Sequence, residues 1–318
     1  MISGKNILIT GGAGFIGSNM AQLLHERNSI TILDDFSEGN EDNIKTLIGK
    51  ESVSVLKGDI TNEKTFDKLH ENFDLVIHLA ANSDVRTGWE YTGKDMDINV
   101  KGTYNVLEFM KRKKITELMF SSSSTVYGEA SVIPTPETYG PCLPISTYGA
   151  SKLANEGFVW TYYHYYGIRP VIYRFANIVG RNSTHGVIHD FMGKLKKNGR
   201  ELEILGDGTQ EKSYMHVDDC IGAMIQIYEK TTEGEIVNLG NTTRTSVRRI
   251  ADIVCETMGL DSVKYNFTGG FEGRGWKGDI KIAQLSIDRM LSHGWKNSQG
   301  SDESVYKASQ EIYKQRVS

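Results

Sequence analysis

Short apolar runs alternate with longer helical patterns through the first 175 residues of the chain, and this alternation constrains the fold more than any other feature. Strand candidates lie at residues 6–10, 30–33, 53–56, 75–79, 118–120 and 171–173, and helical patterns lie near residues 15–27, 62–72, 95–114 and 148–166. Such short runs are typical of strands that a parallel sheet buries on both faces. Repeated strand–helix–strand units predict right-handed crossovers, and therefore an α/β, Rossmann-type doubly wound parallel sheet.

The alternation loosens beyond about residue 176, where glycines cluster at 206–208 and again between 269 and 278. Helical patterns return near residues 187–198, 217–229, 246–258 and 302–316. We interpret this part as a smaller C-terminal lobe that is interleaved with the first domain. The predicted division assigns residues 1–175, plus roughly 213–242, to the Rossmann domain and residues 176–212 and 243–318 to the smaller lobe.

Charge and cysteine content exclude several classes of protein. The 318 residues carry 36 Lys and Arg against 40 Asp and Glu, whereas a general nucleic-acid binder should be basic. The apolar runs are far shorter than the roughly 18 residues of a membrane helix, and the N-terminus lacks the apolar stretch of a signal peptide. Three cysteines without a CxxC pair give neither a disulfide framework nor a cysteine zinc site. We therefore expect a soluble cytoplasmic protein.

A glycine-rich turn directly follows the first strand candidate. Gly11, Gly14 and Gly17 form a GxxGxxG spacing, and Phe15 and Ile16 open the next helical pattern. Glycines allow a tight turn and let a phosphate approach the bare backbone, while the start of the helix offers free N–H groups to that anion. The turn predicts a dinucleotide site, and a simple tight turn is the alternative.

Acidic residues at two later strand ends refine this prediction. Asp34 and Asp35 close the second strand candidate, 17 and 18 positions after Gly17, where an acid can accept hydrogen bonds from the adenosine ribose. An acid there repels a 2′-phosphate, so NAD is favoured over NADP. Asp59 and Ile60, after the third strand candidate, are weaker candidates for contacts with the adenine edge. A solvated loop is the alternative for the aspartates.

Tyr148 and Lys152 lie four positions apart in a helical pattern, which places a phenol and an amine on one face of a helix. A phenol with an ordinary pKa of about 10 is a poor base at neutral pH. We expect the lysine cation, together with a nicotinamide ring, to lower that pKa. Ser123 lies in a hydroxyl-rich segment at the end of a strand candidate, the edge at which doubly wound sheets bind ligands. For Tyr148 and Lys152, the alternative is an exposed pair of side chains on a helix.

The segments TGGAGFIG, LDDF, HLAA, SSSSTVYG, YGASK and RFAN together resemble the extended short-chain dehydrogenase/reductase family over essentially the whole chain, and within it the UDP-glucose 4-epimerases. The resemblance implies an NAD-binding Rossmann lobe, a nucleotide-sugar lobe and tightly held NAD. It implies that Tyr148 removes the proton of the sugar C4 hydroxyl, that Lys152 binds the nicotinamide ribose, and that Ser123 hydrogen-bonds the C4 oxygen. A hydride would leave C4 for NAD and return to the opposite face of a transient 4-keto sugar.

The resemblance also implies further contacts. For the cofactor these are Leu79, Ala80, Ala81, Asn99 and Phe175. For the nucleotide sugar they are Ser83, Asn177, Val187, Gln210, Lys212, Arg274 and Asp279. No metal is expected: His185 and His189 form an HxxxH that lacks a third ligand, and His216 with Asp218 and Asp219 falls at the junction between the lobes.

Two departures from the family pattern concern the expected diphosphate site. Lys212 stands where the family has an arginine, and it keeps the charge but loses the two-pronged guanidinium. Arg274 comes two positions earlier than the usual second arginine, which leaves Arg274 or Lys277 as the second clamp. Ala283 falls at the position that gates the sugar 2-position, which predicts that UDP-N-acetylglucosamine is used as well as UDP-glucose.

The residues after Ser123 bear on the type of reaction. Family dehydratases and decarboxylases usually place acids there, whereas this chain has Ser124 and Thr125, which favours epimerisation. The alternatives are a 4,6-dehydratase, a decarboxylase or a non-catalytic NAD-binding regulatory protein. One helical pattern is crowded with aromatics, for which core packing is one interpretation and an interface the other; these aromatics are Trp160, Tyr162, Tyr163, Tyr165 and Tyr166. The resemblance implies a homodimer through this helix and the one near 95–114, since relatives in the family dimerise through them.

Overall fold

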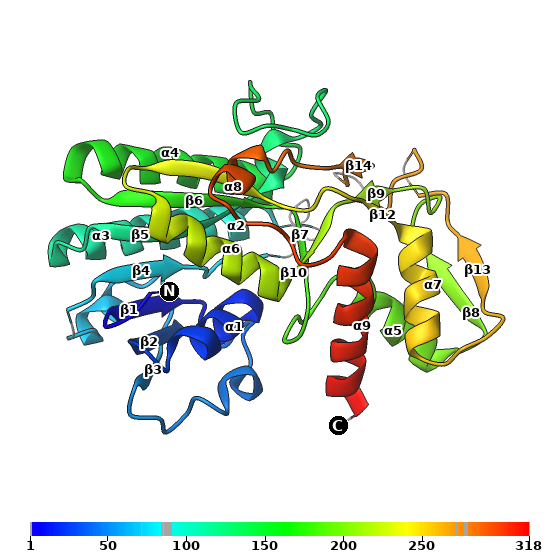
Figure 1. Cartoon of the computed structure of the whole chain (residues 1–318), viewed down its shortest axis with the longest axis horizontal. Coiled ribbons are helices and arrows are strands. Elements are labelled where there is room, and N and C mark those ends of the chain that lie inside the picture. The colour runs from blue at the N-terminus through cyan, green and yellow to red at the C-terminus, as the bar shows by residue number, and fades with distance from the viewer. Residues whose placement is uncertain are drawn as a thin grey trace. The chain divides into compact units, whose positions relative to one another are not determined.

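The computed structural model describes residues 2–70, 72–83, 85, 91–270, 272–276 and 279–317 (Figure 1). The chain divides into two compact units, and each is described by itself. Unit 1 comprises Met1–Gly128, Gly140–Arg174 and Ile221–Val237, and unit 2 comprises Glu129–Tyr139, Phe175–Cys220 and Asn238–Ser318.

Unit 1 is built on a seven-stranded sheet whose strand order is β11-β6-β5-β4-β1-β2-β3. The strands are β1 (Asn6–Thr10), β2 (Ser29–Asp34), β3 (Val53–Lys57), β4 (Leu75–His78), β5 (Glu117–Ser123), β6 (Arg169–Phe175) and β11 (Glu235–Leu239). The helical elements are α1 (Phe15–Leu24), η1 (Glu41–Ile44), η2 (Glu63–Lys68), α2 (Thr92–Asp95), η4 (Met96–Lys101), α3 (Gly102–Lys113), η5 (Ser124–Tyr127), α4 (Thr147–Tyr166) and α6 (Val217–Lys230), which begins in unit 2.

The sheet follows the doubly wound pattern that the sequence predicts. β1 pairs in parallel with β2 on one side and with β4 on the other, and the β2–β3 and β4–β5 pairs are parallel as well. Figure 1 shows the strands from β3 through β1 to β6 in this order. Because the chain reverses its direction of winding between β1 and β4, ligands are expected outside the carboxyl ends of these two strands.

Side chains alternate between the two faces of this sheet, as the pleat of a strand requires. On one face, strand residues pack with α3 and α4 in a cluster that includes Leu8, Val76, Phe120, Ile172, Val106, Phe109, Met110 and Val159. On the other face, Tyr173 is fully buried and its hydroxyl donates to the carbonyl of Met224 in α6 over 2.7 Å. The helices thus cover both faces, which explains why the strands read as continuous apolar runs.

Three details of unit 1 differ from the sequence-based expectation. β11 was not predicted, because its sequence EIVNL offers only three scattered apolar residues. The helix predicted for residues 62–72 is a short 3-10 turn, η2, which Asn62 caps and which ends where Leu69 becomes extended. The helix predicted for residues 95–114 is interrupted by the π-helical turn η4, and π-turns inside α-helices are frequent at functional sites.

Unit 2 consists of short strands and three longer helices around its own core. Its elements are β7 (Asn177–Val179), α5 (Val187–Lys197), β8 (Glu201–Ile204), β9 (Glu211–Lys212), β10 (Tyr214–His216), β12 (Thr245–Ser246), α7 (Val247–Thr257), β13 (Lys264–Phe267), β14 (Ile282–Ala283), α8 (Asp288–Ser292) and α9 (Ser301–Val317). Helices α5, α7 and α9 pack on one another (Figure 1). Their core includes Phe191, Leu195, Ile250, Val254, Val305 and Ile312.

No helix in the described part of the chain is long and apolar enough to span a membrane.

Candidate active site

Unit 1 brings the three predicted catalytic residues together. Ser123 is the last residue of β5, and Tyr148 and Lys152 lie in the first two turns of α4, which Ser146 caps. The hydroxyl group of Ser123 is near enough to the phenol of Tyr148 to act on its pKa. The Lys152 ammonium lies 5.8 Å from the centre of the Tyr148 ring and donates a 2.8 Å hydrogen bond to the carbonyl of Ser121. A serine, a phenol and an amine therefore share one small region at the carboxyl end of the sheet.

Gly149 explains how the start of α4 can approach β5 so closely. A Cβ atom on Gly149 would lie 2.6 Å from the carbonyl oxygen of Thr125, a distance that real Cβ atoms do not reach. With hydrogen in place of a side chain, the first turn of α4 packs directly on the η5 turn. This contact holds Tyr148 beside Ser123.

The Ser123 hydroxyl has a defined orientation. Its oxygen accepts hydrogen bonds from the Thr125 backbone N–H at 3.2 Å and from the Thr125 hydroxyl at 2.9 Å. Because both lone pairs are engaged, the Ser123 proton is left to donate to the phenol oxygen of Tyr148. Such a bond stabilises the phenolate, and it acts to lower the pKa of Tyr148.

Burial dominates the titration of this group of residues. It raises the pKa of Tyr148 to about 12, against the lowering effect of Ser123, while the charge of Asp95 raises it further. Burial also lowers the pKa of Lys152 to about 8, although Glu156 and Asp95 counteract it. In the chain by itself, burial thus outweighs the lowering effect of Ser123 on Tyr148, and the expectation that Lys152 together with a nicotinamide ring lowers the pKa of the phenol stays a prediction.

A buried polar network supports the first turn of α4, and sequence reasoning missed its central carboxylate. Asp95 accepts hydrogen bonds from the amide of Asn82 at 2.7 Å and from the hydroxyl of Thr147 at 2.6 Å. Asn99, in the π-helical turn, donates to Ser151 at 2.9 Å and accepts from the backbone N–H of Asn82 at 2.8 Å. The four-residue spacing of Asp95 and Asn99 was the only signal in the sequence.

The glycine-rich turn has the shape that a dinucleotide requires. A Cβ on Gly11 would lie 2.6 Å from the backbone nitrogen of Ala80, and one on Gly17 would lie 2.1 Å from the carbonyl oxygen of Gly11. α1 begins at Phe15 after Gly14, without a side-chain cap and without an acid in its first turn. The turn therefore packs on the end of β4 at the switch point and leaves N–H groups of the helix start for an anion. These features fit the pyrophosphate of NAD.

The acidic candidates divide into one buried and two exposed side chains. Asp34 is buried and accepts backbone N–H bonds from Ala13 and Phe36, both at 2.9 Å. Burial raises its pKa despite these two bonds. Asp35 and Asp59 are exposed and bond to hydroxyl-bearing residues two positions on. Asp34 thus joins the glycine turn to the end of β2, and its oxygens keep lone pairs for a ribose hydroxyl.

The other expected cofactor contacts occupy different places. Leu79, Ala80 and Ala81 are half-buried just after β4, and Ile60 is buried. Ser83, an expected contact of the nucleotide sugar, is half-buried in the same stretch of unit 1. Phe175 is buried at the end of β6 and belongs to unit 2.

Unit 2 gathers two of the predicted diphosphate cations, and each is paired with a carboxylate. The Lys212 ammonium contacts Asp279 at 2.6 Å, and it lies 5.4 Å from the centre of the Trp276 ring. The Arg274 guanidinium pairs with Glu129 and donates to the carbonyl of Asp279 at 3.2 Å. Lys277, the alternative second clamp, lies outside the described residues.

The remaining substrate candidates of unit 2 lie on different elements. Asn177 begins β7 and donates to the carbonyl of Ser213, Val187 opens α5, and Gln210 is buried with its amide oxygen unpaired among the described residues. Ala283 in β14 is the register partner of Lys212 in β9. Ala283, the position predicted to gate the sugar 2-position, therefore lies next to Lys212.

The two histidine motifs have structural partners. His185 precedes α5 and His189 lies within it, so the HxxxH does not sit on one helix; His189 bonds to Ser183 at 3.0 Å and to Arg316 at 2.7 Å. His216 lies within ligand distance of Asp218 and Glu311. However, cations already pair with these carboxylates, since Arg181 and Lys307 both contact Asp218 at 2.7 Å.

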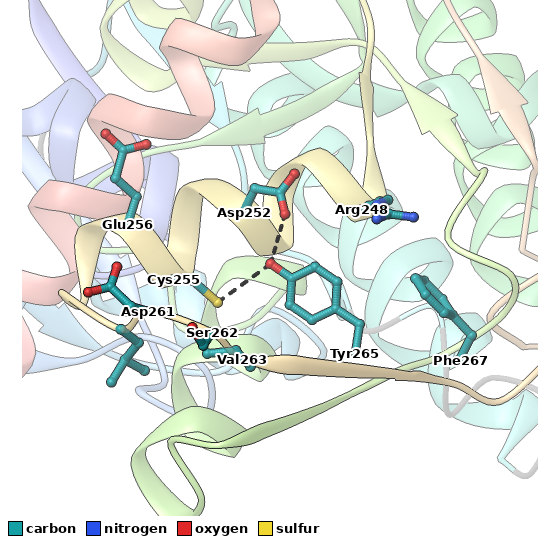
Figure 2. Close-up of a pocket in the computed structure, with 10 residues that line it drawn as sticks. Arg248, Asp252, Cys255, Glu256, Asp261, Ser262, Val263, Tyr265 and Phe267 are labelled. Carbon is teal, nitrogen blue, oxygen red and sulfur yellow. Dashed lines mark hydrogen bonds between the residues drawn. The ribbon is translucent and has the colours of Figure 1, made fainter.

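A pocket of about 590 Å³ in unit 2 is separate from the residues predicted for the site (Figure 2). It lies between α7 and the segment leading into β13. The hydroxyl of Tyr265 donates to Asp252 at 2.8 Å there and lies 3.7 Å from the sulfur of Cys255. The Tyr265 hydroxyl thus has its partner within the pocket.

Comparison with known proteins agrees with this fold. Residues 7–240 match the NAD dependent epimerase/dehydratase family, so the chain belongs to this family of NAD-dependent enzymes. A Methanocaldococcus jannaschii protein provisionally named UDP-glucose 4-epimerase is 35% identical over 298 residues, which are 91% of this chain and 92% of the relative.

Two further relatives show the range of activities. A crystal structure of UDP-galactose 4-epimerase is 34% identical, with a TM-score of 0.87 over 98% of this chain and 99% of that one. A UDP-N-acetyl-alpha-D-glucosaminuronate decarboxylase of Bacillus cytotoxicus is 32% identical over 258 residues, 78% of each protein.

Proposed function

We propose that the protein is a UDP-hexose 4-epimerase that interconverts UDP-glucose and UDP-galactose through a 4-keto sugar. The single observation that carries this proposal is the placement of Ser123 and Lys152 beside the phenol of Tyr148. In this arrangement Tyr148 can exchange a proton with a sugar hydroxyl, and Ser123 can hydrogen-bond the oxygen of the same hydroxyl. The similarity to proteins named as UDP-glucose and UDP-galactose 4-epimerases supports the same reaction.

The residues present fit NAD as the cofactor. Gly11, Gly14 and Gly17 would hold its pyrophosphate, and Asp34 would accept the adenosine ribose hydroxyls. When bound, NAD supplies a reversible two-electron oxidation of a carbon–hydrogen bond. Because the oxidation is reversed in the same catalytic cycle, the net reaction needs no added oxidant or reductant.

Tyr148 carries the proton in the proposed mechanism. As the C4–H electrons leave the sugar, the phenolate accepts the proton of the C4 hydroxyl, and it returns this proton after reduction from the opposite face. Ser123 donates to the C4 oxygen and fixes its position. The Lys152 cation stabilises the phenolate, and its pKa of about 8 leaves it mostly protonated at neutral pH.

Decarboxylation by this chain is the rival function, since one relative bears that name. The residues that follow Ser123 argue against it. Thr125 engages both of its donors with Ser123, and no carboxylate lies at the two positions after the serine. The carboxylate whose charge raises the pKa of Tyr148 is Asp95, and its oxygens are occupied by Asn82 and Thr147.

We further propose that the substrates include UDP-N-acetylglucosamine. Ala283, next to Lys212 across the β9–β14 pair, presents only a methyl group at the position that the resemblance assigns to the sugar 2-substituent. The kcat/KM values for UDP-glucose and UDP-N-acetylglucosamine should lie within a hundredfold of each other. A larger preference for UDP-glucose contradicts this assignment.

Product NMR tests the reaction. The purified protein is incubated with UDP-glucose, UDP-N-acetylglucosamine and UDP-glucuronate, with and without added NAD. Inversion at C4 is expected, and it should fall at least a thousandfold in Tyr148→Phe. Tyr127→Phe provides a matched control, because Tyr127 is a buried tyrosine of the neighbouring η5 turn. Release of carbon dioxide or water from any substrate would contradict the proposal and indicate a decarboxylase or a dehydratase. Binding of NAD with no turnover would favour a regulatory protein.

The protein is also proposed to form a homodimer through α3 and α4. Tyr104, Phe158, Tyr165 and Tyr166 are exposed on these helices, with Tyr165 73% exposed. Light scattering coupled to size exclusion should give twice the chain mass at micromolar concentration, and a monomer there contradicts the proposal.

A further inference from the structure

We infer that the indole N–H of Trp276 is a hydrogen-bond donor to the diphosphate of the nucleotide sugar. The inference rests on the proposed function, since it assumes a diphosphate ligand. It adds a binding residue of a different chemical type to the two cations discussed above.

The Trp276 nitrogen is a buried donor that lacks a partner in the described part of the chain. Leaving such a donor unpaired is unfavourable, because the buried N–H has lost its hydrogen bond to water. The ring is nevertheless held firmly, because the Lys212 ammonium lies over it and the Trp276 carbonyl accepts the backbone N–H of Asp279 at 3.1 Å. An unfilled donor beside a cation is suited to an anionic oxygen.

The charges around Trp276 are balanced before any ligand binds. Asp279 holds Lys212 through one carboxylate oxygen and the backbone N–H of Gly275 through the other. Glu129 holds Arg274. Both cations are therefore engaged, whereas the indole N–H has no partner among the described residues, so a phosphate oxygen can accept its hydrogen bond without displacing another acceptor from it.

Glu129 is the carboxylate that an anionic ligand would displace from Arg274. Its side chain is 49% exposed, while that of Arg274 is 22% exposed, so the carboxylate is the partner that solvent can readily take up. A phosphate group that exchanges with Glu129 on Arg274 enters the same small cluster as Trp276. Glu129 thus competes with the ligand, and its removal should tighten binding.

Calorimetric titration with UDP and with uridine tests the inference. Trp276→Phe keeps an aromatic ring near Lys212 and removes the N–H donor together with part of the indole ring, a loss of ring that the control variant below shares. Its Kd for UDP should rise about tenfold, as the loss of a hydrogen bond to a charged group predicts, while its Kd for uridine should not change. Glu129→Gln should lower the Kd for UDP severalfold.

Trp295→Phe is the matched control. The Trp295 nitrogen is likewise buried and unpaired among the described residues, but no described lysine or arginine lies over that ring as Lys212 lies over Trp276. This variant should bind UDP as the parent protein does. Equal UDP affinity in Trp276→Phe and the parent overturns the inference, and so does an equal loss for uridine, which would place the ring against the base. A parent protein that binds neither UDP nor UDP-sugars instead overturns the proposed function.

Discussion

Glu156 in α4 and Arg174 in β6 form a buried ion pair in which two guanidinium nitrogens donate to the two carboxylate oxygens, at 2.9 and 2.6 Å. Both side chains are only 6% exposed. Ser122 donates to the same carboxylate at 2.5 Å, and the guanidinium lies 4.7 Å from the Tyr127 ring. The pair therefore joins α4, β5 and β6 directly behind the catalytic side chains.

Glu156→Gln should reduce the free energy of unfolding by about 3–5 kcal/mol, because it leaves the Arg174 charge buried and unpaired. Urea denaturation measures this loss. Asp67→Asn, which breaks the exposed Asp67–Arg112 pair, should cost less than about 1 kcal/mol. A similar small effect in both variants would show that the buried pair is not a structural anchor.

Thr125 is expected to position Ser123. Thr125→Val removes the hydroxyl that donates to Ser123 at 2.9 Å, so the serine proton is no longer directed at the phenol. We expect kcat to fall roughly three- to tenfold with little change in KM, since one neutral hydrogen bond is lost. The pH–rate profile should also move to higher pH, because Ser123 lowers the pKa of Tyr148. Thr125→Ser should restore both properties, and an unchanged profile in Thr125→Val argues against the role.

Gly17→Ala should abolish retention of NAD. The added methyl would lie 2.1 Å from the Gly11 carbonyl oxygen, so the glycine turn must shift away from α1. Absorbance of the cofactor released from purified protein measures the loss. Gly193→Ala is the control, because a Cβ there meets no atom within 4 Å in the middle of α5. It should keep NAD and stabilise the protein by about 0.5–1 kcal/mol.

His78 should make the protein sensitive to acid. It is fully buried between Thr10 and Thr103, and burial, reinforced by Lys152, lowers its pKa to about 3. Between about pH 3 and pH 6.5, the imidazole of His78 is protonated in the unfolded chain but neutral in the folded chain. The stability that His78 contributes is therefore complete above pH 6.5 and falls with decreasing pH, by at most about 1.4 kcal/mol per unit.

Urea unfolding of His78→Gln between pH 4 and 8 checks this slope. The variant is expected to be less stable at neutral pH and to lose less stability as the pH falls. His70→Gln, at an exposed position, should keep the slope of the parent protein. Parallel curves for the parent protein and His78→Gln would contradict the prediction.

The sheet could be predicted from sequence because its strands are buried on both faces and so read as apolar runs. β11 and the π-helical turn could not be, since their form depends on neighbours distant in the sequence: β11 on β6, and the turn at Asn99 on its bonds to Asn82 and Ser151. The proximity of Tyr148 and Lys152 could also be predicted from the sequence, because residues four positions apart lie on the same face of a helix.

The electrostatics of the site could not be predicted in the same way. A YxxxK spacing suggests a lysine that lowers the pKa of a phenol, yet burial decides the sign for Tyr148 and also lowers the pKa of Lys152. The bonds between Thr125 and Ser123, and the pairing of Arg274 with Glu129, join side chains whose approach only the fold determines.

The boundaries of the two units have a practical consequence for how the protein can be taken apart. The chain passes from one unit to the other five times, at residues 128–129, 139–140, 174–175, 220–221 and 237–238. No single cut can release either unit with all of its segments. Truncation and fusion experiments must therefore treat the polypeptide as indivisible, and exchanging one unit with that of a homologue would require several simultaneous crossovers.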